Sequence, residues 1–142
     1  MQNIDETRIA HMGMIQGIIT RLETNAFTLK ALAMTLATAV LAIGGSVENP
    51  TWLYPLAGVF PVVVFWLMDA KYLQLGRLFR RHFDAVRQGQ VESPFDMNIT
   101  PYRQQEQHLL RIALSWSVLP VYGSILAIFV GAMVFLLSCN LP

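Results

Sequence analysis

The chain has 142 residues, the usual size of a single domain. Its 54% hydrophobic and 13% charged residues exclude an ordinary soluble domain, in which about a quarter of the residues are charged. The formal net charge of +1 gives no reason to expect nucleic acid as a partner, and the single cysteine, Cys139, excludes an intrachain disulfide. We therefore expect an integral membrane protein whose main partner is the lipid bilayer.

Three apolar stretches predict three transmembrane helices. They cover residues 27–47, 52–68 and 113–137, and their lengths suit the roughly 20 residues that cross the hydrocarbon of a bilayer. Gly44, Gly45 and the nearby Pro50 predict a tight turn between the first two spans, which should therefore be antiparallel neighbours. The N-terminal residues lack the basic start and compact apolar core of a cleavable signal peptide.

The segments outside the spans have the pattern of amphipathic helices. Apolar residues recur at three- and four-residue steps in residues 4–26 and again in residues 69–88. Gln88 and Gly89 should end the second helix, and Thr100 followed by Pro101 is a typical helix start. We therefore predict a further cytoplasmic helix over residues 101–112 that continues into the third span.

The expected fold class is an all-α membrane protein of three long helices, half in lipid and half in a cytoplasmic helical stalk. The distribution of basic residues predicts its orientation. All ten Lys and Arg either precede the apolar core of the first span or lie between the second and third spans. The positive-inside rule then places the N-terminus and the long loop in the cytoplasm, and Cys139 outside, in what we expect to be a bacterial inner membrane. Trp66 and Trp116 should belong to the aromatic belt at the cytoplasmic interface.

Three charged residues fall at about the same depth when the predicted helices are laid side by side. Lys30, Asp69 and Arg111 would all lie at the cytoplasmic edge of the bilayer. A half-buried carboxylate there should pair with a cation, because an unpaired charge at that depth is costly. The three residues would form either a gate or sensor network, or a structural ion pair that sets the depth of the helices.

A stripe of small residues runs along the third predicted span. Gly123, Ala127 and Gly131 recur at four-residue spacing, which predicts a helix-packing face, and Ala33 and Ala37 repeat the pattern more weakly on the first span. The partner of this face would be another span of the same chain or another subunit. Because three spans bury little surface by themselves, we favour a homo-oligomer.

Basic residues also gather on the predicted helix that follows the second span. Arg77, Arg80, Arg81 and Arg87 would contact anionic lipid headgroups or an acidic ligand, or else form the solvated face of an amphipathic helix. The loop over residues 91–99 would either dock a partner or pack back on the stalk.

The sequence has no motif of an enzyme, a cofactor site or a metal site. The three histidines fall one per predicted cytoplasmic helix. By the helical rise, however, His11 and His82 stand about 20 to 25 Å from the membrane edge and His108 only about 8 Å. That separation is too large for one metal ion. We therefore expect no catalytic residues, no cofactor and no metal.

Several short motifs of this chain are informative together. They are Met14-Ile15-Gln16, Ile19-Thr20-Arg21, Asn25-Ala26-Phe27 with Lys30, Phe60-Pro61, Phe65-Trp66-Leu67-Met68-Asp69, Tyr72-Leu73 and Arg77-Leu78-Phe79-Arg80. Over residues 9–87 the chain resembles a family of small bacterial inner-membrane proteins that is associated with antiphage defence neighbourhoods. It departs from this family at Leu22 and Glu23, where a Met and a small residue are more usual.

The resemblance implies an oligomeric defence-type or stress effector that perturbs the membrane on a cytoplasmic signal, such as a small ligand. An alternative is a non-conducting anchor or accessory subunit that docks a soluble cytoplasmic protein. A second alternative is a holin-like lysis protein, although a large ordered stalk counts against it.

The predicted orientation is tested by reporter fusions. Fusions at Ser46, Gly89 and Pro142 should read outside, inside and outside respectively, because all basic residues fall on one side of the predicted spans. A cytoplasmic reading at Pro142 would contradict three spans.

Overall fold

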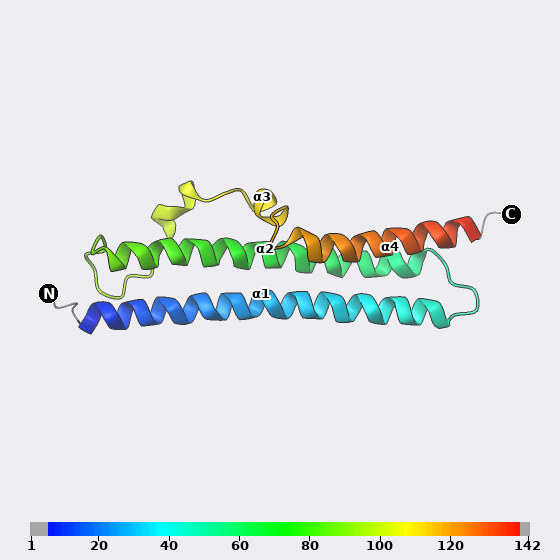
Figure 1. Ribbon diagram of the computed structural model, residues 1–142, viewed down its shortest axis with the longest axis horizontal. Helices are drawn as coiled ribbons and strands as arrows, with labels where there is room; N and C mark the ends of the chain where they lie inside the picture. The colour runs from blue at the N-terminus through cyan, green and yellow to red at the C-terminus, as the bar shows by residue number, and fades with distance from the viewer. Residues whose placement is uncertain (1–5, 140–142) are drawn as a thin grey trace.

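The computed structural model describes residues 6–139, and every regular element in that range is a helix (Figure 1). Helix α1 (Glu6–Ser46) and helix α2 (Leu53–Arg87) lie antiparallel, side by side over their full length. Helix α4 (Leu119–Cys139) packs beside the N-terminal half of α2. The short elements η1 (Thr100–Gln105) and α3 (Leu109–Ala113) lie along the rest of α2. The predictions for residues 4, 5 and 140–142 lie outside the described range.

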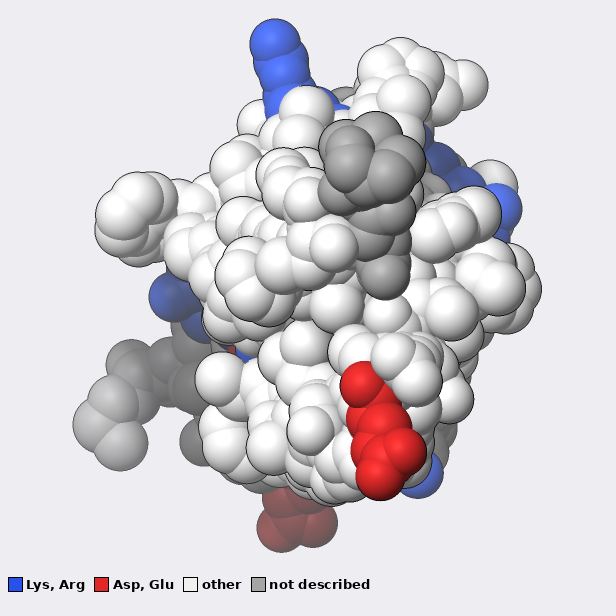
Figure 2. Space-filling model, turned by 90° about the vertical axis from the view of Figure 1, so that its right-hand side faces the viewer, with Lys and Arg blue, Asp and Glu red and all other residues white. Residues whose placement is uncertain are grey.

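Helices α1, α2 and α4 each contain a stretch long and apolar enough to cross a membrane. This confirms the predicted all-α fold class with three spans, and the chain is a candidate multi-pass membrane protein. Between Lys30 and Asp69 only Glu48 is charged, and no charged residue follows Arg111. The end of the molecule with the Ser46–Leu53 connection accordingly shows Lys and Arg only at its rim (Figure 2). We call this apolar half the membrane half and the opposite half the stalk.

Helix α2 ends as the sequence predicts. Arg87 is its last residue, and Gly89 follows in the left-handed conformation with φ of 73°. The Gly89 N–H donates to the Val86 carbonyl at 3.1 Å, and the Gln90 N–H donates to the Ala85 carbonyl at 3.0 Å. This is a Schellman motif, which glycine favours because it has no Cβ to clash at positive φ.

The prediction of one continuous helix from residue 101 to residue 137 is wrong. Residues Thr100–Gln105 form a 3₁₀ helix, and Glu106 is extended with φ of −94° and ψ of 148°. Helix α3 has only five residues, and the third span begins at Leu119 instead of residue 113. Thr100 is not the cap residue either, because Ile99 takes that position and no side chain caps the helix.

Tertiary contacts with α2 and one proline explain this break. The indole Nε1 of Trp66 on α2 donates to the Ala113 carbonyl at 2.9 Å, so a partner outside the segment satisfies that carbonyl. Pro120 stands in the first turn of α4, where its missing N–H breaks no helical hydrogen bond. A helix that ran through Pro120 would lose such a bond and meet a steric clash. Starting a new helix here therefore costs less than continuing the old one.

Three apolar clusters hold the helices together, one in each half of the molecule and a third around Ala70 at the junction. In the membrane half, α1, α2 and α4 meet in a cluster that includes the fully buried residues Ala33, Val62, Tyr122 and Phe129. In the stalk, Ile15 and other apolar residues of α1 and α2 pack with Met97 from the connecting loop. Gly58 lets α2 lie close to α4, since a Cβ atom there would stand 2.5 Å from Phe129 Cζ.

We predict that Gly58→Ala destabilises the packing of α2 on α4. The added methyl would overlap a ring that is 1% exposed and has little space to move, and overpacking of this kind typically costs about 1 to 3 kcal/mol. The matched control is Gly76→Ala on the same helix, since a Cβ there meets nothing within 4 Å. Thermal unfolding in detergent should show a lower Tm for Gly58→Ala only, and an equal loss in both variants would contradict this packing.

Candidate functional site: a buried ion pair where spans and stalk meet

A buried ion pair joins α1 to α2 at the junction of the membrane half and the stalk. Lys30 Nζ lies 2.6 Å from Asp69 Oδ2, and the two side chains are 24% and 1% exposed. The pair comes together because Lys30 follows the start of the first apolar stretch and Asp69 directly follows the second. In an antiparallel hairpin these positions fall at the same level. Among residues 6–139 Lys30 is the one cation that forms an ion pair with this carboxylate.

Two aromatic side chains close this site on the side of α4. Tyr122 is fully buried, and its ring stacks on that of Trp66 with centroids 6.3 Å apart and planes 9° apart. The Tyr122 hydroxyl lies close enough to the Asp69 carboxylate to interact with it electrostatically. All three spans therefore meet around one carboxylate, with Lys30 of α1 and Tyr122 of α4 beside it.

Arg111 does not join this pair, contrary to the predicted network of three charges, although its neighbours on α3 pack at the same level against Ala70. It is exposed on α3 and forms no ion pair within residues 6–139. The break in the third helix is the reason. Ile112 and Ala113 turn toward Ala70 of α2, which leaves Arg111 facing outward.

The geometry makes the pair a fixed point between α1 and α2. Sliding α1 along α2 would separate the Asp69 carboxylate from the Lys30 ammonium in a poorly solvated site, which is strongly unfavourable. The arrangement therefore sets the register of the two long helices. A rearrangement of the stalk therefore either moves α1 and α2 together, with the Lys30–Asp69 contact kept, or breaks that contact.

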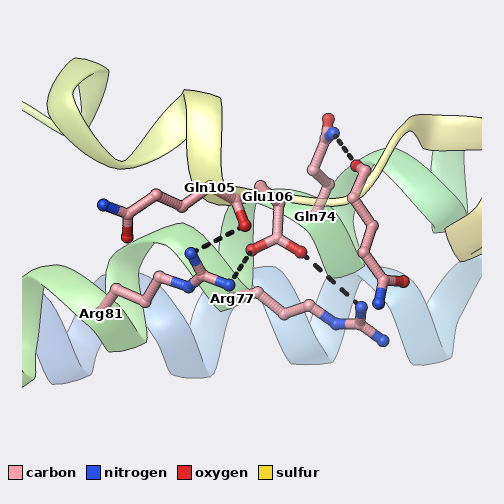
Figure 3. A network of polar contacts seen from close by, with 6 residues as sticks. Gln74, Arg77, Arg81, Gln105 and Glu106 are labelled. Atoms are coloured by element: carbon pink, nitrogen blue, oxygen red, sulfur yellow. Dashed lines mark hydrogen bonds and ion pairs between the residues drawn. The ribbon is translucent and has the colours of Figure 1, made fainter.

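A second buried carboxylate ties the connecting segment to the stalk (Figure 3). Glu106 is 3% exposed, with its oxygens 3.7 Å from Arg77 Nη1 and 3.4 Å from Arg81 Nη2. Arg81 also donates to the Gln105 carbonyl at 3.0 Å, and Gln74 Nε2 donates to the Gln107 carbonyl at 3.1 Å. These contacts hold the chain extended between η1 and α3, and the sequence analysis did not anticipate them.

The other two arginines of the predicted basic face are also paired. Arg80 pairs with Glu23 of α1, at the position where the sequence departs from the resemblance, and Arg87 lies 3.2 Å from Asp84 on its own helix. Both pairs are more than half exposed and contribute little to stability. The proposed contact of this face with lipid or an acidic ligand stays a prediction.

Two histidines fasten the loop between α2 and η1. His11 Nε2 and His82 Nε2 lie 2.8 Å and 2.6 Å from one acceptor, the Asp96 carbonyl, and both rings are buried. Both nitrogens must carry the proton, since a carbonyl only accepts. Phe95 adopts φ of 62° beside them, which is uncommon for a bulky residue. His108 is exposed at the start of α3, outside this arrangement.

The residues of the predicted packing faces point in different directions. Ala33 and Ala37 are buried inside the chain. Gly123 is half-buried beside Leu119 of its own helix, whereas Ala127 and Gly131 are exposed. The α4 stripe is therefore free for a partner outside the chain.

Comparison with protein-family models, with curated proteins and with solved structures finds no match to this chain. The resemblance to inner-membrane proteins of defence neighbourhoods therefore stays a prediction. The function has to be argued from the geometry.

We predict that Asp69→Asn lowers stability much more than the same change at Asp84. Loss of the charge leaves Lys30 without its partner, which for fully buried pairs costs about 3 to 5 kcal/mol and should cost less here because Lys30 is 24% exposed. Asp84 belongs to an exposed pair worth about 0 to 1 kcal/mol. The measurement is the Tm of each variant in detergent, and equal values for wild type and Asp69→Asn would show that the pair is energetically unimportant.

Proposed function

We propose that the protein is a homo-oligomeric inner-membrane effector that perturbs the membrane when its stalk, facing the cytoplasm, receives a signal. The observation that carries the proposal is a continuous face of small residues along α1, on the side turned away from α2 and α4. Its members recur at steps of three and four over both halves of the molecule, and all are exposed. They are Ala10, Gly13, Gly17, Thr20, Thr24, Thr28, Ala31, Thr35, Thr38, Ala42 and Gly45.

The threonines of this face suit a helix interface in lipid. Thr28, Thr35 and Thr38 each donate their hydroxyl to the carbonyl four residues earlier, at 2.9 Å. Their polar atoms are therefore satisfied within α1, and the methyl groups are left for packing. Small side chains let two helix backbones approach closely, which drives helix association in membranes where a hydrophobic force is lacking.

The length of this face favours a second copy of the chain as its partner. A matching helix must be apolar over one half and water-compatible over the other, as α1 itself is. The exposed stripe with Ala127 and Gly131 on α4 supplies another face of the same kind. Two such faces on different helices would allow an assembly larger than a dimer.

Coupling between stalk and spans is supported by the continuity of α1 and α2 through the junction. Neither helix is interrupted there, and the Lys30–Asp69 pair locks their register. A signal that rearranges the stalk would therefore shift the spans, since a rigid helix transmits displacement along its axis. Rearranged spans in an oligomer are a direct route to a membrane defect.

We predict that Ala31→Leu reduces the size of the assembly. A leucine at this site would hold the paired backbones apart, at a typical overpacking cost of about 1 to 3 kcal/mol. Ala57→Leu is the matched control, because Ala57 is exposed on α2 beside the exposed Leu56 and Phe60. Mass photometry in detergent should show smaller particles for Ala31→Leu and for Gly131→Leu but not for the control. A monomeric wild type would refute the proposal.

Effector activity is tested by expressing the protein in bacteria while measuring dye uptake and membrane potential. The proposal expects permeability changes that require both the oligomer and the Lys30–Asp69 pair. An intact membrane potential together with a co-purifying soluble protein would instead favour the non-conducting anchor. Permeability that survives Ala31→Leu and Asp69→Asn would favour a holin-like lesion.

A further inference from the structure

The segment that interrupts the third helix exposes an unusual group of side chains. Leu110, Leu114 and Trp116 are 70%, 62% and 90% exposed, although they are large and apolar. Arg111 lies among them, also exposed and without an ion pair in the described part of the chain. We call residues 109–116 the boundary segment.

The depth of the boundary segment is set by its inward face. Ile112 and Ala113 are buried against Ala70 and Trp66, and the Trp66 indole donates to the Ala113 carbonyl at 2.9 Å. Ala70 directly follows Asp69, the residue at which the apolar stretch of α2 ends. The boundary segment therefore stands where the membrane half meets the stalk, at the level of the lipid headgroups.

From this placement we infer that the boundary segment is a binding surface for anionic phospholipid headgroups. Leucine side chains at this level can enter the acyl region, and tryptophan prefers the interface because its ring is apolar and its N–H is polar. The guanidinium of Arg111 is then at the height of the phosphates, which it can bind through two parallel hydrogen bonds. Lys71, one residue after Ala70, is also exposed and adds positive charge at the same level.

The charge distribution favours lipid over a second copy of the chain. No acidic residue follows Glu106, and the small-residue face of α1 carries no carboxylate between Glu23 and Glu48. A neighbouring subunit that docked at this level through α1 or α4 would therefore offer Arg111 no carboxylate as a counter-ion from residues 24–47 or from the residues after Glu106. An anionic lipid offers one at the required depth, and this inference does not depend on the proposed effector activity.

The test places the protein in nanodiscs of phosphatidylcholine, alone or mixed with phosphatidylglycerol. In each sample only one of the two lipids carries bromine on its acyl chains. Bromine quenches tryptophan fluorescence at short range, and a Trp116→Phe variant isolates the contribution of Trp116. We expect stronger quenching by brominated phosphatidylglycerol than by brominated phosphatidylcholine at equal bulk fraction. Equal quenching by both lipids, or accessibility of Trp116 to aqueous iodide only, would overturn the inference.

Arg111→Gln should weaken the preference for phosphatidylglycerol about five-fold, the usual contribution of one basic residue at an anionic surface. Arg111→Lys should retain most of it, because the charge is kept. Arg103→Gln is the matched control, since Arg103 is exposed on η1 in the stalk. An equal loss for Arg103→Gln and Arg111→Gln would show a general charge effect and overturn the assignment. If neither brominated lipid nor iodide quenches the fluorescence of Trp116, protein covers the boundary segment. That result would also overturn its assignment as a lipid-binding surface.

Discussion

The structure depends on one electrostatic constraint, a carboxylate at the point where hydrocarbon begins. Asp69 is buried between the spans and forms an ion pair with Lys30, so the two long helices favour the register that brings these residues together. Apolar packing alone is a weak guide to register in lipid, because lipid tails are as apolar as the side chains they would replace. The ion pair therefore fixes the register of α1 and α2, which the packing of the spans alone would leave loosely defined.

Polar contacts play the same role in the stalk. Residues 100–108 have few apolar side chains, and Glu106 among them forms ion pairs with Arg77 and Arg81 of α2. The loop before it is held by two buried imidazoles that share the Asp96 carbonyl. Buried polar groups must find partners, and here the partners come from different helices. This is why the connection folds back against α2 in short elements instead of continuing as one long helix.

The surfaces that these internal contacts leave open fall into two kinds. The small-residue face of α1 is smooth and internally satisfied, which suits another helix, whereas the boundary segment is bulky, apolar and basic, which suits the headgroup region of a bilayer. The two lie on different helices. Assembly and lipid contact could therefore act at the same time, and the position of the boundary segment would anchor the oligomer at a defined depth.

The sequence by itself determined the elements that depend on local chemistry. Hydropathy and length predicted three spans, periodicity predicted that α1 and α2 extend beyond them, and Gly89 marked the end of α2, because each of these is set within one or two turns of chain. Lys30 and Asp69 also lie at about the same distance along the chain from the turn between α1 and α2, so the sequence predicted that they face each other. The sequence did not predict the break after Gln105, the exposure of Arg111 or the meeting of His11 with His82. These depend on contacts between distant residues, such as Trp66 with the Ala113 carbonyl. Only the tertiary structure decided them, because a backbone carbonyl or a buried charge takes whichever partner the packing of the helices brings within reach.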